Sequence, residues 1–145
     1  MGKMKILVLN GVNMNMLGKR NPQQYGTDTL AQLEKKISSH IESYGWQAEC
    51  RQSNCEGVLV DILQQTDADG VVLNAGAYSH YSLALRDCIE SLPFPVAEVH
   101  MTDISKREVF RHTDVLKEVC QGYFCGKGLQ SYLDAVDFLV SEVKK

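Results

Sequence analysis

The chain has 145 residues, 44% of them apolar, and a formal net charge of −3. This length fits one domain, and the balance of apolar and charged residues excludes a disordered chain, a collagen-like chain and a coiled coil. The slight acidic excess disfavours a nucleic-acid binder, and no apolar run approaches the roughly 20 residues of a membrane helix. We therefore expect a single catalytic domain over residues 1–145.

The five cysteines are an odd number, so they cannot all pair within one chain. No export signal opens the sequence, and we expect a cytoplasmic protein with reduced thiols. Two pairs are each separated by four residues, whereas structural zinc sites more often have spacers of about two residues. We therefore expect no metal site. The cysteines are Cys50, Cys55, Cys88, Cys120 and Cys125.

The first predicted element is a strand over residues 5–10, a short and nearly continuous apolar run typical of a strand covered on both faces. A helix follows from Thr29, which has the spacing of a capping box with Gln32, and it ends at Gly45. Its apolar residues recur on one helical face: Leu30, Leu33, Ile37 and Ile41.

Further strands are expected near residues 47–53, 70–74, 94–100 and 119–125. Helices are expected over residues 57–66 and 82–91 and from residue 129 to 143. Such alternation favours parallel strands joined by crossover helices, which predicts a three-layer α/β sandwich with a five-stranded parallel sheet. Ligands of these sheets bind beyond the carboxyl ends of the strands.

Polar side chains gather where these strands are expected to end. The loop over residues 10–28 is long and without predicted structure, and such loops are usually functional. In the fourth strand, alternation places Glu98 and His100 on the same face. Each feature also has a simpler explanation in turn chemistry, helix capping or, for Arg107 and Arg111, surface ion pairs.

These residue types suit a particular chemistry. A histidine beside a carboxylate suits a general acid, as His100 beside Glu98 would be. A tyrosine such as Tyr25 acts as a base only when nearby positive charge, here from Arg20, favours its ionised form. Amide side chains can stabilise a developing enolate, and no glycine-rich phosphate loop follows the first strand. The pattern indicates proton abstraction beside a carbonyl with acid-assisted loss of a leaving group.

Four motifs carry a resemblance to a known family. They are LNGVNMNMLGKRNP at residues 9–22, followed by Tyr25-Gly26, then QSNCEG at 52–57, NAGAYSHYSLALRD at 74–87 and EVHMTDISKREVFRH at 98–112. In order and spacing they resemble the motifs of type II 3-dehydroquinate dehydratases, and the resemblance spans essentially the whole chain.

The resemblance implies a flavodoxin-like fold and a cofactor-free dehydration of 3-dehydroquinate to 3-dehydroshikimate. The reaction would serve the shikimate pathway or quinate breakdown. The family assembles as trimers grouped into dodecamers, so a homo-oligomer is expected, without nucleic acid or membrane partners. The alternatives are a flavodoxin-like small-molecule binding module and a catalytically inactive oligomer.

The resemblance also implies catalytic roles by position. Tyr25 matches the base, which acts as tyrosinate, and Arg20 matches the arginine that favours this ionised form from a mobile lid. Asn13 matches the residue that holds a water against the enolate. His100 matches the acid that protonates the departing hydroxyl, and Glu98 matches its partner.

Further positions match contacts to the substrate. Those to its hydroxyl groups are Asn74, His80 and Arg111. The backbone N–H of Met101 and the hydroxyl of Thr102 match the site of its carboxylate, and Asp87 matches a residue that reaches in from a neighbouring subunit.

The chain departs from the family pattern at several positions without removing any of these roles. Valine and alanine replace prolines at Val12 and Ala75, and Asn21 replaces a glutamate. Asp103 replaces an asparagine near the expected carboxylate site, where its negative charge would weaken binding of an anionic substrate if it faced that site. We expect activity to survive these changes.

Overall fold

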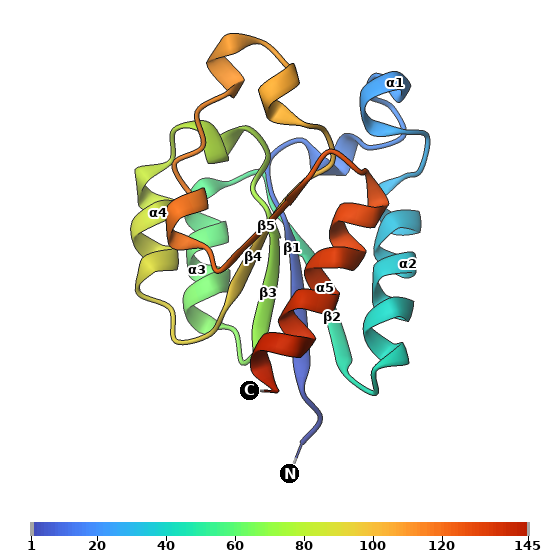
Figure 1. Cartoon of the computed structure of the whole chain (residues 1–145), viewed down its shortest axis with the longest axis vertical. Helices are drawn as coiled ribbons and strands as arrows, with labels where there is room; N and C mark the ends of the chain where they lie inside the picture. Colours follow the sequence, from blue (N-terminus) through green and yellow to red (C-terminus); the bar gives the residue numbers. More distant parts are fainter. Residues whose placement is uncertain (1, 145) are drawn as a thin grey trace.

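A five-stranded parallel sheet forms the centre of the computed structural model, which describes residues 2–144 (Figure 1). Its spatial order is β2-β1-β3-β4-β5, with every neighbouring pair parallel. This confirms the predicted sheet. The strands are β1 (Lys5–Asn10), β2 (Gln47–Gln52), β3 (Gly70–Asn74), β4 (Val96–His100) and β5 (Gly122–Cys125).

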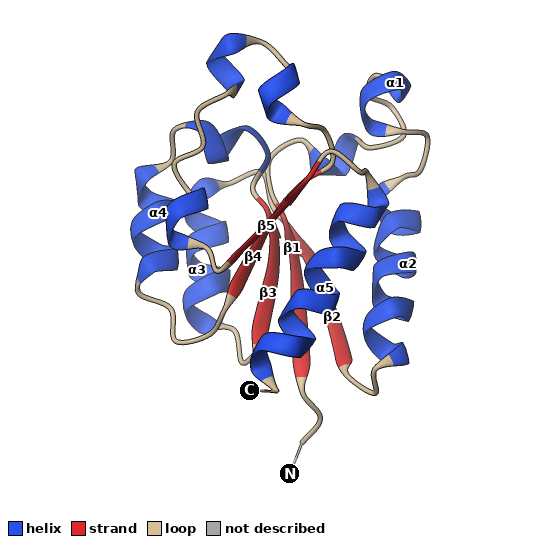
Figure 2. Ribbon diagram, in the orientation of Figure 1, coloured by secondary structure: helices blue, strands red, loops and turns tan. Residues whose placement is uncertain are grey.

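Helices cover both faces of the sheet, as Figure 2 shows, and complete the predicted three-layer sandwich. Helices α2 (Leu30–Ser43) and α5 (Leu129–Val143) pack on one face with one apolar cluster. Helices α3 (Glu56–Gln65) and α4 (Leu83–Glu90) pack on the other face with a second cluster. Because both faces are covered, β3 and β4 are buried along their whole length.

The predicted ends of α2 are confirmed. The Thr29 side chain accepts the N–H of Gln32 at 3.2 Å, and the Gln32 side chain accepts the N–H of Thr29 at 2.8 Å. After the helix, Gly45 has a φ of +79°, the left-handed conformation in which glycine ends a helix without strain. The helix therefore fixes where the long loop after β1 must end.

Two expectations about irregular segments are wrong in part. The loop over residues 10–28 contains a 3₁₀ turn, Met14–Met16, and a short helix α1 (Pro22–Tyr25), capped by the Asn21 side chain, which accepts the N–H of Gln23. Strand β5 begins at Gly122 rather than near residue 119, because Lys117–Val119 forms a 3₁₀ turn. An Asp114 oxygen accepts the N–H of Lys117 and holds this turn.

The loops that follow β1 and β3 lie backbone against backbone. The N–H of Gly11 donates to the carbonyl of Asn74 at 2.7 Å. A Cβ added at Gly11 would lie 2.5 Å from the Ala75 carbonyl oxygen, and one added at Gly76, where φ is +65°, would lie 2.7 Å from the Val12 oxygen. Only glycine fits at both positions.

Over residues 2–144, no helix has the length and apolar character needed to cross a membrane. The five cysteines are all free thiols.

Candidate active site

A pocket lies at the carboxyl ends of the strands, where the predicted fold places ligands. It is built from the loop after β1, from α1, from the turn after β3, and from the end of β4 with the segment that follows. Nine of the residues predicted for the site line it: Asn13, Arg20, Tyr25, Asn74, His80, His100, Met101, Thr102 and Arg111.

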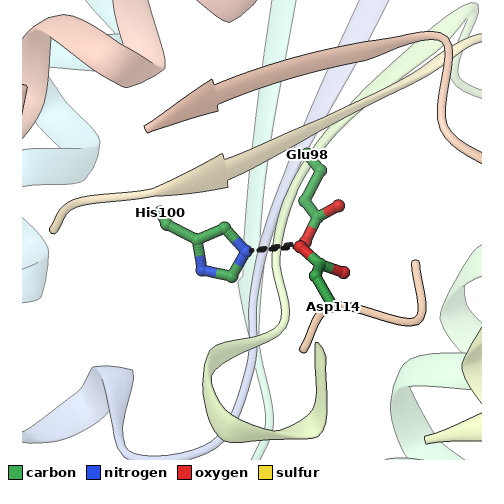
Figure 3. Close-up of side chains that lie close together, drawn as sticks. All are labelled: Glu98, His100 and Asp114. Carbon is green, nitrogen blue, oxygen red and sulfur yellow. Dashed lines mark hydrogen bonds and ion pairs between the residues drawn. The ribbon is translucent and has the colours of Figure 1, made fainter. Parts of the chain in front are cut away.

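His100 and Glu98 lie on one face of β4, as alternation predicts. The His100 Nε2 atom lies 2.6 Å from Glu98 Oε2 and 3.2 Å from an oxygen of Asp114, a residue for which the sequence predicted no role (Figure 3). The Glu98 side chain is completely buried behind the imidazole and does not itself line the pocket. The histidine therefore stands between the pocket and two carboxylates.

This arrangement shifts the titration of all three groups. Burial alone would lower the pKa of His100, but hydrogen bonds to Asp114 and Glu98 raise it to about 9. Burial raises the pKa of Glu98 to about 8. Burial also opposes ionisation of Asp114, but hydrogen bonds with His100 and Glu98 lower its pKa to about 2. The two carboxylates therefore favour the charged form of His100, which is the form that a general acid needs.

Tyr25 receives two charged donors on its hydroxyl oxygen. Arg20 Nη2 donates at 3.0 Å and Arg107 Nη1 donates at 2.9 Å. The Arg20 guanidinium also lies 4.0 Å from the centre of the tyrosine ring. Charge-assisted hydrogen bonds are stronger than neutral ones, so the two guanidinium groups hold the Tyr25 hydroxyl oxygen firmly in place.

Arg107 is a site residue that sequence reasoning missed. Its spacing from Arg111 suggests only a surface ion pair, yet Arg107 lines the pocket and its Nη1 also lies 3.4 Å from the Thr102 hydroxyl. The signal was present, since Arg107 falls inside the fourth matched motif.

Asn74 is held at the pocket edge by a chain of buried hydrogen bonds. Its Nδ2 donates to the Tyr132 hydroxyl at 2.9 Å, and that hydroxyl donates to Asn10 Oδ1 at 2.6 Å. The Asn74 oxygen accepts the N–H of Gly76. Asn13, across the pocket, has a φ of +67°, a left-handed conformation that asparagine tolerates better than most residues.

Besides Glu98, two further residues singled out from the sequence do not line this pocket. Asp87 is exposed on α4, and its contribution to a neighbouring subunit stays a prediction. Asp103 lies outside the lining, and its carboxylate accepts the hydroxyl and the N–H of Ser105, which together lower its pKa. Its charge is therefore directed at its own turn and not at the pocket.

Over residues 2–144, Glu98, His100 and Asp114 form the one group whose atoms could hold a metal ion, with candidate ligand atoms within 4.8 Å of one another. The His100 Nε2 atom already makes hydrogen bonds to both carboxylates, so a cation would have to replace its proton. The expectation of an enzyme without metal or cofactor stays a prediction.

Comparisons with known proteins identify similar sequences. A family profile described as "Dehydroquinase class II" matches residues 4–140. A curated Bacillus pumilus protein named 3-dehydroquinate dehydratase is 50% identical over 138 residues, covering 94% of this chain and 94% of the relative. One of the same name from Ruegeria pomeroyi is 47% identical over 140 residues, with coverage of 95% and 94%.

Solved structures are similar as well. The type II dehydroquinase of Butyrivibrio crossotus is 42% identical and superposes with a TM-score of 0.92, covering 95% of this chain and 98% of the other. A 3-dehydroquinate dehydratase-like protein of Bifidobacterium longum is 26% identical, with a TM-score of 0.72 and coverage of 98% and 99%. The likeness thus extends over nearly the full length in sequence and in fold.

Proposed function

Since this chain belongs to the class II dehydroquinase family, we propose that it removes water from 3-dehydroquinate to form 3-dehydroshikimate, with Tyr25 as base and His100 as acid. One observation carries the assignment of roles. A tyrosine oxygen that accepts two guanidinium donors and an imidazole backed by two carboxylates line the same pocket.

In the first step the Tyr25 phenolate takes a proton from the carbon beside the ketone. The electron pair of that C–H bond moves toward the carbonyl oxygen, which becomes an enolate. Arg20 and Arg107 stabilise the phenolate before the transfer, and Asn13 holds a water that hydrogen-bonds to the enolate oxygen. Oriented donors of this kind are often the largest contribution to catalysis.

In the second step the enolate electrons form the carbon–carbon double bond of the product, and the carbon–oxygen bond to the hydroxyl group breaks. His100 donates a proton to that hydroxyl, which departs as water. Tyr25 then releases the proton it gained and His100 takes one up, so that the enzyme returns to its starting state and only water leaves the substrate.

Substrate recognition uses the remaining polar residues of the pocket. Asn74, His80 and Arg111 contact the hydroxyl groups of the substrate. The Met101 N–H and the Thr102 hydroxyl bind its carboxylate, for which a hydroxyl and a backbone amide are suitable donors. The positive charge of the arginines in the pocket favours an anionic substrate.

We also propose an oligomeric state, a cellular location and a pathway for this chain. We propose a cytoplasmic homododecamer built from trimers, in which Asp87 completes the site of a neighbouring subunit. The exposed position of Asp87 on α4 is compatible with that role. The reaction would belong to the shikimate pathway or to quinate breakdown. Sedimentation or native mass measurement tests the subunit count.

The decisive experiment mixes the purified protein with 3-dehydroquinate and follows the absorbance of the conjugated enone product. We expect steady formation of product without added metal or cofactor, and the same result after treatment with a chelator. Absence of product at high enzyme concentration would contradict the proposal. Binding without turnover would favour a flavodoxin-like binding module instead.

A further inference from the structure

Asp114 lies in the segment between the 3₁₀ turns Val109–Arg111 and Lys117–Val119, and its side chain reaches the proposed acid. Its Oδ1 accepts the N–H of Leu116 at 2.8 Å and that of Lys117 at 3.2 Å. These bonds fix the carboxylate in place and leave Oδ2 for His100 Nε2, 3.2 Å away. The Asp114 side chain is only 5% exposed, so water does not compete freely for this oxygen.

Two carboxylates thus face one imidazole nitrogen in a buried place, and they differ in how well they can hold a negative charge. Glu98 is 0% exposed, and over residues 2–144 its Oε1 is a buried atom without a hydrogen-bond partner. Asp114 instead has two backbone donors. Two close carboxylates resist ionising together, so the one with more hydrogen-bond donors carries the charge. The pKa of Glu98 near 8 and that of Asp114 near 2 agree with this order.

We propose that Asp114 is a positioning residue that supplies the resident negative charge behind His100, while Glu98 carries a proton and links the two. This role of Asp114 concerns His100 as the general acid, and it rests on the proposed function. Because Nε2 is engaged by the carboxylates, Nδ1 is the ring nitrogen left to donate to the substrate.

The pocket that His100 lines is rich in positive charge. Three arginines also line it, of which the last is paired with Glu108: Arg20, Arg107 and Arg111. A protonated imidazole adds to this positive charge, and a protonated Glu98 has no charge to offset it. A negatively charged Asp114, 3.2 Å from His100 Nε2, does offset it.

Among the other titratable groups of this region, Tyr123 and Cys120 supply no competing anion at neutral pH. The His80 ring, from the turn after β3, stacks at 6.4 Å, and the Tyr123 ring of β5 lies 5.8 Å away. Burial raises the pKa of the Tyr123 hydroxyl and of the Cys120 thiol, so both are neutral. Cys125 is the β5 residue in register with His100.

The test is an NMR titration of histidine side chains in full-length protein without substrate. Asp114→Asn should lower the titration midpoint of His100 by about one pH unit or more, the scale expected for loss of a close opposite charge. Glu98 would then have to ionise with its Oε1 unpartnered, which is unfavourable. Glu98→Gln should shift the midpoint less, since glutamine resembles a protonated glutamate.

Matched variants separate this effect from loss of structure. Asp103→Asn makes the same exchange at another turn-capping aspartate, one that does not contact His100, and should leave the His100 midpoint unchanged. If Asp114→Asn does not fold, Asp114→Ser keeps an oxygen that can cap the turn. His100→Asn identifies the resonance among the four histidines. An unchanged midpoint in the Asp114 variants, or a larger shift in Glu98→Gln, would overturn the proposal.

Activity gives a second readout. The kcat of Asp114→Asn should fall further below wild type as the pH rises, because the acid loses its proton at lower pH. A loss of equal size at every pH would indicate a merely structural role and contradict the proposal. If the wild-type protein shows no turnover of 3-dehydroquinate, the proposed function fails, while the titration still decides the role of Asp114.

Discussion

The two walls of the pocket are held in different ways. On one wall, the strand wall, His100 ends strand β4, which is hydrogen-bonded to β3 and β5, and its partner Glu98 is fully buried. On the other wall, the loop wall, Tyr25 ends a helix of four residues and is half-buried. Its hydroxyl oxygen is held by Arg20 and Arg107, two side chains from separate segments.

This difference teaches that the proposed acid and the proposed base are positioned at different levels of structure. The sheet positions the proposed acid, His100. The proposed base, Tyr25, is positioned by contacts between the loop after β1 and the segment after β4. Changes in the loop wall should therefore affect catalysis with little loss of stability, whereas changes beneath the strand wall should affect stability first.

The largest expected effect comes from Tyr25→Phe. Loss of the proton-accepting oxygen should lower kcat by about 10²- to 10⁴-fold, the usual contribution of a general base, and should leave the thermal unfolding midpoint nearly unchanged. Steady-state kinetics and calorimetry measure both. Tyr81→Phe is the control, because Tyr81 is 63% exposed and outside the pocket. Wild-type turnover in Tyr25→Phe would remove the tyrosinate mechanism.

Arg107→Lys should have the next largest effect. Lysine keeps the charge but loses the planar donor group, and loss of one charged hydrogen bond should lower kcat by about 10- to 100-fold. Arg51→Lys, at an exposed residue of β2, should have no effect on kcat. A rise in KM with unchanged kcat would show instead that Arg107 binds substrate and does not position the base.

Tyr132→Phe tests the strand wall. Removing its hydroxyl leaves Asn74 Nδ2 and Asn10 Oδ1 without the partner that they share, which should lower the free energy of unfolding by about 1–3 kcal/mol in urea titrations. Tyr44→Phe removes a bond to Asp137 at the surface and should cost less than about 1 kcal/mol. Equal losses in the two variants would contradict the difference between buried and exposed bonds.

The smallest effect is expected from Asn21→Ala. The substitution removes the cap of α1, the helix that carries Tyr25, and should change the free energy of unfolding by about 1 kcal/mol or less. The kcat should fall by less than about tenfold, the factor to which 1.4 kcal/mol corresponds. Asn21→Asp keeps the accepting oxygen and should restore kcat. A larger fall in stability than in Tyr132→Phe would reverse the comparison of the two walls.

The regular part of the fold could be predicted because it depends on local pattern. Alternation placed Glu98 and His100 on one face, and the spacing of Thr29 and Gln32 located the start of α2. Both are consequences of backbone geometry over a few residues. The polar residues at the strand ends indicated the edge of the sheet at which the pocket lies, and the resemblance to the dehydroquinase family supplied the nine pocket residues.

Arg107 and Asp114 could not be assigned roles in this way. Both lie after β4, in a segment of short 3₁₀ turns without a periodic pattern. Their contacts reach across the fold to Tyr25, 82 positions away in sequence, and to His100. Such contacts depend on the path of the whole segment, which no local spacing encodes. The same reasoning explains why β5 begins later than its apolar run suggested.

The backbone contact between the loops after β1 and β3 has a consequence for how the protein tolerates mutation. A side chain at Gly11 would collide with the Ala75 carbonyl, and one at Gly76 with that of Val12. Neither collision can be relieved by a rotamer change, because each involves main-chain atoms. In a randomised library selected for growth that depends on this activity, positions 11 and 76 should therefore retain only glycine. The neighbouring positions, Val12 and Ala75, should each accept other small side chains.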